Sequence, residues 1–175
     1  MGHIVLFHSV YGSRGVERRA AALLREAGHQ VRTPDLYAGA TAATLGEGFA
    51  IKERIGWDVI EGRARAALAD LPSDVVLAGF SMGAGVVGAL LPSRPATRAV
   101  VLVHGVTAVP GGIPAQVHVA DPDPFAPREQ WPGGAEVFAY PGAGHFFTDE
   151  DLPEHDPVAA SLVWRRVLGF LSGPV

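Results

Sequence analysis

The sequence has 175 residues, a formal net charge of −4, no cysteine and a hydrophobic fraction of 48%, which suits one α/β domain over residues 1–175 with its own core. The missing cysteines exclude disulfides and thiolate chemistry, and the mildly acidic balance argues against a nucleic-acid partner. No apolar run has membrane-spanning length and no signal peptide is visible, so we expect a cytoplasmic protein without a membrane partner.

Short apolar runs alternate with helical stretches along the chain. The first run, residues 3–8, is continuous and rich in β-branched side chains, as in a strand buried on both faces. Thr44 and Glu47 have the spacing of a capping box before a long helical stretch that breaks near Gly56. In chain order we expect a strand over 3–8, a helix over 14–27, a strand over 29–33, helical structure over 47–70, a strand over 74–79, a helix over 82–91, strands over 98–104, 115–120 and 135–140, and a helix over 157–171.

Six strands with helices between most of them predict an α/β fold with a mostly parallel sheet. One connection is unusual, because residues 105–114 are too few for a crossover helix between parallel strands.

The strongest motif is Gly-Phe-Ser-Met-Gly at residues 79–83, which matches the G-x-S-x-G pattern of a nucleophile elbow. An apolar strand runs into it and a helix of small residues leaves it, which is the context that the pattern requires. The alternative is a glycine-rich turn with an incidental serine. We favour Ser81 as a nucleophile because a hydroxyl on a sharp strand-to-helix turn projects away from the backbone, and small flanking residues allow that turn.

The glycines at 83, 85 and 88 also read as G-x-G-x-x-G, the fingerprint of a dinucleotide site. That site needs an acidic residue about 20 positions later, at the end of the next strand, and the next strand ends at His104 and Gly105 instead. Close helix packing explains these glycines, so we expect no bound cofactor.

A serine nucleophile needs a histidine base and an acid that orients it. On an α/β sheet they follow the serine in the order acid, then histidine, from loops at the carboxyl ends of later strands. Asp121 and Asp123 follow one such strand, and His145 follows the next, after Gly-Ala-Gly. We favour Asp123 as the acid, with Asp121 as the alternative, because a short turn must carry the carboxylate toward the histidine. A plain surface-loop histidine is the alternative for His145.

These segments resemble the dienelactone hydrolase family of α/β-hydrolases, in a form with a serine nucleophile. The resemblance covers nearly the whole chain and includes the loop after the first strand, the exit of the second strand and three catalytic segments, at residues 7–12, 34–39, 79–83, 123–125 and 140–145. It implies a minimal α/β-hydrolase with strand order 2-1-3-4-5-6 and no lid domain, for which residues 105–114 leave no room. It also assigns Asp123 as the acid.

Three positions depart from the family's namesake. Ser81 replaces its cysteine nucleophile, Ser9 replaces the acidic residue that gates that cysteine, and Asp149 replaces a substrate-binding arginine four residues past the histidine. We expect the acidic run 149–151 to be a solvated turn that repels an anionic substrate, which argues against dienelactone itself.

The expected reaction is hydrolysis of a small carboxylic ester or lactone, with His145 as base and Asp123 holding its tautomer. The backbone N–H of Met82 would bind the oxyanion, together with Val10 by the resemblance. No metal is expected, because H-E-x-x-H spacing is absent. We expect further pocket residues at His8, Ser9, Tyr11, His104 and Phe146, with Trp57 as part of an apolar wall. The alternative for Trp57, Tyr11 and Phe146 is a place in the core.

Two other functions fit the same pattern. One is an α/β-hydrolase fold that binds its ligand without turnover, and the other is a flavodoxin-like cofactor-binding protein. A short chain without a lid also predicts an open site for small molecules. Its unprotected sheet edge is expected to favour a homodimer.

Overall fold

The computed structural model describes residues 2–173. Within that range six strands form one fully parallel sheet in the order β2-β1-β3-β4-β5-β6, so the expected strand order is confirmed. The strands are β1 (His3–Phe7), β2 (Gln30–Arg32), β3 (Val76–Phe80), β4 (Ala99–Val103), β5 (Ala115–Asp121) and β6 (Glu136–Pro141). The helices are α1 (Gly15–Glu26), α2 (Leu45–Ile55), α3 (Trp57–Ala66), α4 (Met82–Leu90) and α5 (Pro157–Ser172), with 3-10 turns at Leu91–Ser93 and Arg128–Gln130.

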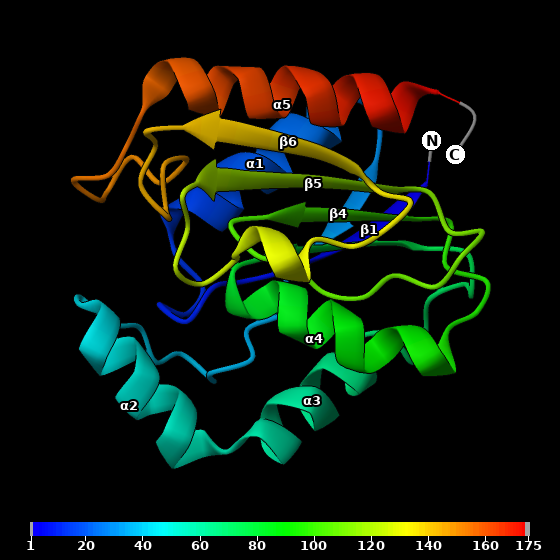
Figure 1. The fold of residues 1–175 in the computed structure, drawn as a ribbon. Coiled ribbons are helices and arrows are strands. Elements are labelled where there is room, and N and C mark those ends of the chain that lie inside the picture. Colours follow the sequence, from blue (N-terminus) through cyan, green and yellow to red (C-terminus); the bar gives the residue numbers. More distant parts are fainter. Residues whose placement is uncertain (1, 174–175) are drawn as a thin grey trace.

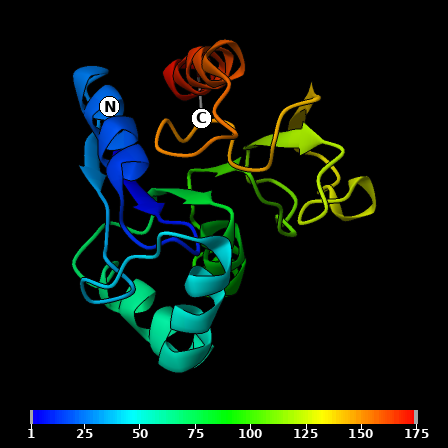
Figure 2. The same cartoon turned by 90° about the vertical axis from the view of Figure 1, so that its left-hand side faces the viewer.

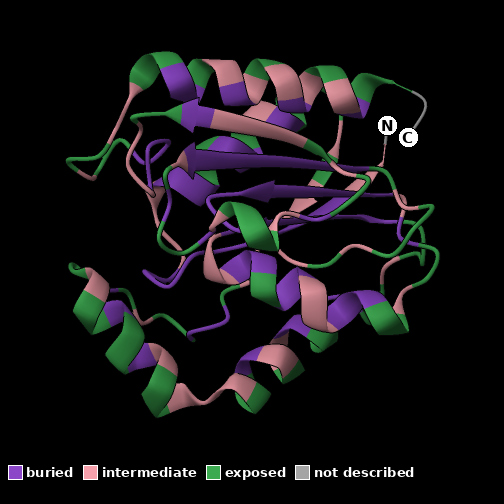
Figure 3. Cartoon of the chain, in the orientation of Figure 1, coloured by how far each residue is buried: buried purple, intermediate pink, exposed green. Residues whose placement is uncertain are grey.

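Helices cover both faces of the sheet (Figure 1, Figure 2). Side chains on β1 alternate between the two layers, because successive residues of a strand point to opposite faces. Ile4 and Leu6 pack with α1 and α5, whereas Val5 and Phe7 pack with α3 and α4. The central strands β1, β3 and β4 are therefore almost wholly buried, while the outer strand β6 is partly exposed (Figure 3).

The long helical stretch divides where the sequence predicts. Gly56 has a φ of 86°, a left-handed conformation that glycine adopts without strain, and it separates α2 from α3. The capping box at the start of α2 is also present, since the Glu47 N–H donates to Thr44 Oγ1 at 3.2 Å and the Thr44 N–H donates to the Glu47 carboxylate at 3.2 Å.

The connection between β4 and β5 contains no helix. Apolar side chains of the loops after β4 and β5 pack on the core at this side of the sheet, where a crossover helix would otherwise lie: Val106, Val109, Ile113, Ala126 and Trp131. The short connection therefore keeps the sheet covered without leaving length for a lid. None of the helices in residues 2–173 is long and apolar enough to cross a membrane.

A buried polar chain crosses β5 and β6 beneath α5. Arg166 donates to the Tyr140 hydroxyl at 3.2 Å, and that hydroxyl lies 2.8 Å from His118 Nδ1. His118 Nε2 lies 2.9 Å from Gln116 Oε1, so the ring accepts on one side and donates on the other as a neutral imidazole. Burial, reinforced by the charge of Arg166, lowers the pKa of His118 from 6.5 to about 3.

This buried histidine makes stability depend on pH. Between the two pKa values the unfolded chain binds a proton that the folded chain excludes. The stabilisation is therefore complete above pH 6.5 and is lost as the pH falls toward 3, by up to about 1.4 kcal/mol per pH unit. We expect the Tm of the wild type to fall more between about pH 7 and pH 5 than that of His118→Gln, measured by circular dichroism. An equal fall in both proteins would contradict this assignment.

Candidate active site

Ser81 occupies a sharp turn between β3 and α4, with φ 49° and ψ −106°. This is a strained conformation for a residue other than glycine. Two glycines make the turn possible. A Cβ at Gly79 would lie 2.4 Å from the backbone of Gly83, and a Cβ at Gly83 would lie 2.4 Å from the carbonyl oxygen of Phe7. The first turn of α4 thus rests directly on the ends of β1 and β3.

The structure brings Ser81, His145 and Asp123 into one hydrogen-bonded chain. Ser81 Oγ lies 2.9 Å from His145 Nε2, and His145 Nδ1 lies 2.7 Å from Asp123 Oδ2. A carboxylate only accepts, so Nδ1 carries the proton and Nε2 accepts from the serine. The Asp123 side chain is fully buried, and its other oxygen accepts from the Phe125 N–H at 2.9 Å.

Asp121, the alternative acid, faces away from the histidine. Its carboxylate pairs with the Arg128 guanidinium on the surface, which lowers the pKa of Asp121. The two aspartates thus separate into a buried partner of His145 and a surface ion pair.

Aromatic rings fix the histidine from two sides. The Phe146 ring meets the His145 ring edge to face at 4.4 Å between centroids, and the Phe125 ring lies at 4.8 Å. The backbone N–H of Phe146 donates to the exposed Glu154 carboxylate at 2.8 Å. The imidazole is therefore held by packing as well as by its carboxylate.

The two expected oxyanion donors border the same cavity as Ser81. Met82 is the first residue of α4, where an N–H has no acceptor within the helix and the helix dipole favours negative charge. Val10 lies in the loop after β1, and α2 presses on its backbone at Gly48, where a Cβ would stand 2.7 Å from the Val10 oxygen. The Tyr37 hydroxyl donates to Met82 Sδ at 3.2 Å, which steadies that side chain.

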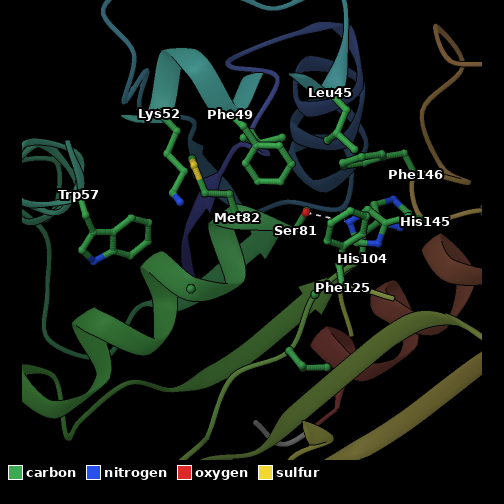
Figure 4. A pocket seen from close by; sticks show the side chains of 14 residues that line it. Leu45, Phe49, Lys52, Trp57, Ser81, Met82, His104, Phe125, His145 and Phe146 are labelled. Atoms are coloured by element: carbon green, nitrogen blue, oxygen red, sulfur yellow. Dashed lines mark hydrogen bonds between the residues drawn. The ribbon is translucent and has the colours of Figure 1, made fainter. Parts of the chain in front are cut away.

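A cavity of about 270 Å³ opens beside Ser81 (Figure 4). Phe49 and Phe125 stand at its mouth, where they remain 39% and 47% exposed, so the cavity is open to solvent. Its lining comes from α2, α3, α4 and the loops after β1, β3, β4, β5 and β6, namely Val10, Leu45, Phe49, Lys52, Trp57, Ser81, Met82, Gly85, His104, Gly105, Val106, Phe125, His145 and Phe146.

The expected pocket residues divide into two groups. His104, Phe146 and Trp57 line the cavity, whereas three residues of the loop after β1 lie buried behind it: His8, Ser9 and Tyr11. His8 turns toward the exit of β2, where its Nε2 accepts from the Leu36 N–H at 3.0 Å and its Nδ1 lies 2.7 Å from the Ser9 carbonyl oxygen. Burial lowers the pKa of His8, so its neutral ring joins the loop after β1 to the exit of β2 by hydrogen bonds.

Sequence reasoning missed the contribution of α2. Leu45, Phe49 and Lys52 all border the cavity, and their spacing of four and three residues places them on one helix face. That spacing is visible in the sequence, but nothing there shows which way the face is turned. Phe125 and Val106 were missed for a similar reason, since they lie on irregular loops.

His104 is a buried wall of the cavity and not a second base. Its Nε2 lies 2.7 Å from Thr148 Oγ1, and burial together with the nearby His145 keeps the pKa of His104 well below 6.5. The neutral ring therefore adds no positive charge beside His145.

The acidic run after the histidine is the expected solvated turn at the exposed Glu150 and Asp151, but not at Asp149. Asp149 is only 4% exposed and pairs with Arg14, while Glu150 and Asp151 pair with Arg19. None of the three borders the cavity. Arg14 and Arg19 offset part of the charge of these three carboxylates, and the expected repulsion of an anionic substrate stays a prediction.

The glycines of the alternative dinucleotide fingerprint have packing roles inside α4. A Cβ at Gly85 would lie 3.4 Å from the Trp57 ring, and one at Gly88 would lie 2.1 Å from the Thr107 hydroxyl. Across residues 2–173 no three His, Asp or Glu side chains are grouped to hold a metal ion.

Comparisons with known proteins identify the family and the fold. The model of the dienelactone hydrolase family matches residues 2–173. A dienelactone hydrolase-like promiscuous phosphotriesterase from metagenomic libraries superimposes with a TM-score of 0.74 at 20% identity, over 98% of this chain and 86% of that chain. A protein of Xanthomonas campestris pv. campestris assigned to the α/β hydrolase superfamily gives a TM-score of 0.65 at 19% identity, over 98% and 99%. At such identities these likenesses show the fold; no curated protein matches the chain significantly.

The strain at Ser81 makes a stability prediction. Glycine adopts this backbone conformation more readily than serine or alanine does. We expect Ser81→Gly to be more stable than Ser81→Ala by about 1 kcal/mol in urea unfolding. Equal stability of the two variants would show that the elbow is not strained.

Proposed function

The chain belongs to the dienelactone hydrolase family and is a hydrolase that acts on ester bonds, and we propose that it cleaves small carboxylic esters or lactones through an acyl-enzyme on Ser81. The observation that carries the proposal is the hydrogen-bonded chain from Ser81 through His145 to Asp123. The serine hydroxyl lies at the unprotonated Nε2 of an imidazole whose Nδ1 is bound to a carboxylate, and this arrangement suits nucleophilic attack.

In the first step His145 Nε2 takes the Ser81 proton while Oγ bonds to the substrate carbonyl carbon. The negative charge moves to the carbonyl oxygen, where the N–H groups of Met82 and Val10 receive it. Collapse of this tetrahedral species breaks the ester C–O bond, and the new imidazolium gives its proton to the leaving oxygen. In a lactone that oxygen stays attached to the acyl group.

In the second step water attacks the acyl-enzyme, and His145 accepts its proton. A second tetrahedral species forms in the same oxyanion site, and its collapse releases the carboxylic acid and returns the proton to Ser81. Asp123 keeps the imidazole in the tautomer with Nδ1 protonated and stabilises the imidazolium in both steps.

The cavity favours a small acyl or alcohol group with an apolar body. Phe49, Phe125 and Trp57 supply aromatic surface near Ser81. Among the lining residues Lys52 carries the one fixed charge, and its nearest carboxylate is the neighbouring Glu53 at 3.5 Å. Figure 4 shows its amine on the side of the cavity away from His145. We therefore include esters with a remote anionic group in the proposed substrate class.

The test of the triad combines labelling with kinetics. We expect a fluorophosphonate to label Ser81, and we expect Ser81→Ala and Asp123→Asn to lower kcat on p-nitrophenyl acetate by at least about 10³-fold. Asp121→Asn is the matched control, because that carboxylate pairs only with Arg128 at the surface. Wild-type rates in Ser81→Ala would overturn the proposed function, and a loss in Asp121→Asn equal to that in Asp123→Asn would overturn the choice of acid.

Lys52 makes a prediction about selectivity. We expect Lys52→Met to raise KM for mono-p-nitrophenyl adipate about three- to tenfold, because one charge-assisted contact is lost. KM for the neutral p-nitrophenyl hexanoate should stay unchanged in the same variant. Equal effects on the two esters would show that Lys52 contributes packing and not charge recognition.

A further inference from the structure

A buried ion pair joins the loop after β1 to the loop that carries His145. Arg14 closes the first loop as the N-cap of α1, and its Nη2 lies 3.3 Å from Asp149 Oδ2 in the second. The two side chains are 14% and 5% exposed, so water screens the pair weakly. Arg19 adds a more distant contact, at 3.9 Å from the other Asp149 oxygen.

We propose that Arg14 and Asp149 are positioning residues that hold the Val10 N–H in place relative to His145. The inference rests on the proposed function, since it concerns how the two halves of that site are kept together. Neither residue borders the cavity, so each acts through the loop to which it belongs.

A line of packed rings connects the ion pair to the histidine. The Arg14 guanidinium carbon lies 4.8 Å from the centre of the Tyr11 ring. The Tyr11 ring meets Phe146 edge to face at 5.1 Å, and Phe146 meets His145 at 4.4 Å. Tyr11 directly follows Val10, so a shift of this ring moves the oxyanion donor and the base relative to each other.

The loop after β1 is also hydrogen-bonded to α1. The buried Glu17 carboxylate accepts from the Arg14 N–H at 2.8 Å and from the Ser9 N–H at 3.4 Å. Burial raises the pKa of Glu17, and the nearby Asp149 adds to that rise. Arg14 thus contacts two buried carboxylates, Glu17 through its backbone N–H and Asp149 through its guanidinium, and so connects the loop after β1 both to α1 and to the histidine loop.

Asp149 in turn organises the histidine loop. Its N–H donates to the Phe146 carbonyl oxygen at 2.9 Å, and its Oδ1 accepts from the Asp151 N–H at 3.0 Å. The turn that follows His145 is therefore built around the same carboxylate that Arg14 binds. Asp149 therefore contributes both to the turn after His145 and to the contact with the loop after β1.

The rival explanation is that the ion pair only stabilises the fold. A double variant that removes both charges distinguishes this explanation from a positioning role. Replacing both members of a buried ion pair by apolar residues often leaves stability unchanged. We expect Arg14→Met with Asp149→Leu to keep a Tm within about 3 °C of wild type. If positioning matters, kcat on p-nitrophenyl acetate should still fall about 10- to 100-fold, with KM within about twofold.

A folded double variant with wild-type kcat would overturn the proposal. If the double variant does not fold, Asp149→Asn decides, because it keeps the size of the side chain and the acceptor for the Asp151 N–H but weakens the contact with Arg14. We expect it to lower kcat at least about threefold at unchanged KM, and wild-type kcat in this variant would also overturn the proposal.

The matched control is the Arg98–Asp74 pair, 2.5 Å apart at the opposite end of the sheet. Arg98→Met with Asp74→Leu should leave kcat and KM unchanged. If this control lost as much kcat as Arg14→Met with Asp149→Leu, the loss would be due to general destabilisation, and the positioning role would be refuted.

The two proposals fail in different ways. A wild-type protein without Ser81-dependent turnover would refute the proposed function itself, whereas an active wild type with equally active variants would refute only the role of Arg14 and Asp149.

Discussion

The site depends on how closely three backbone segments approach one another at the elbow. The start of α4 touches the end of β1 at Gly83 and folds back onto β3 at Gly79, at distances that leave no room for a side chain. This contact makes the chain turn sharply at Ser81, so that its side chain projects from the turn. The N–H of Met82, which has no acceptor within the helix, lies beside it. It also brings the loop after β1, with Val10, to the same point.

The parallel sheet supplies the remaining groups. Because all six described strands run in one direction, their carboxyl ends share one edge, and residues 10, 81, 123 and 145 meet there although they are far apart in sequence. The hydrolase therefore needs no inserted domain to assemble its site. Its walls come from α2, from the first residues of α3 and α4, and from loops that also complete the core.

Burial separates the roles of the histidines. His8, His104 and His118 are enclosed, and their pKa values are lowered by desolvation, so they remain neutral hydrogen-bonding groups. Within the described chain, His145 has both a buried carboxylate and a serine hydroxyl at hydrogen-bond distance. The same residue type thus provides buried hydrogen-bonding groups and a wall of the cavity, while the carboxylate on Nδ1 and the hydroxyl on Nε2 set His145 apart as the proposed base.

The sequence by itself determined the six strands, the elbow and the placement of His145 and of the two candidate aspartates, because these follow from local patterns and from the rule that parallel strands end at one edge. The strand order and the choice of Asp123 came with the resemblance to a known family. It did not determine that Asp149 lies inward against Arg14, that His8 turns from the cavity to Leu36, or that α2 presents Lys52 to the cavity. Those outcomes depend on the rotation of helices and the path of irregular loops. Contacts between different segments of the chain decide them, such as those of His8 with Leu36 and of Arg14 with Asp149, and no local periodicity encodes such contacts.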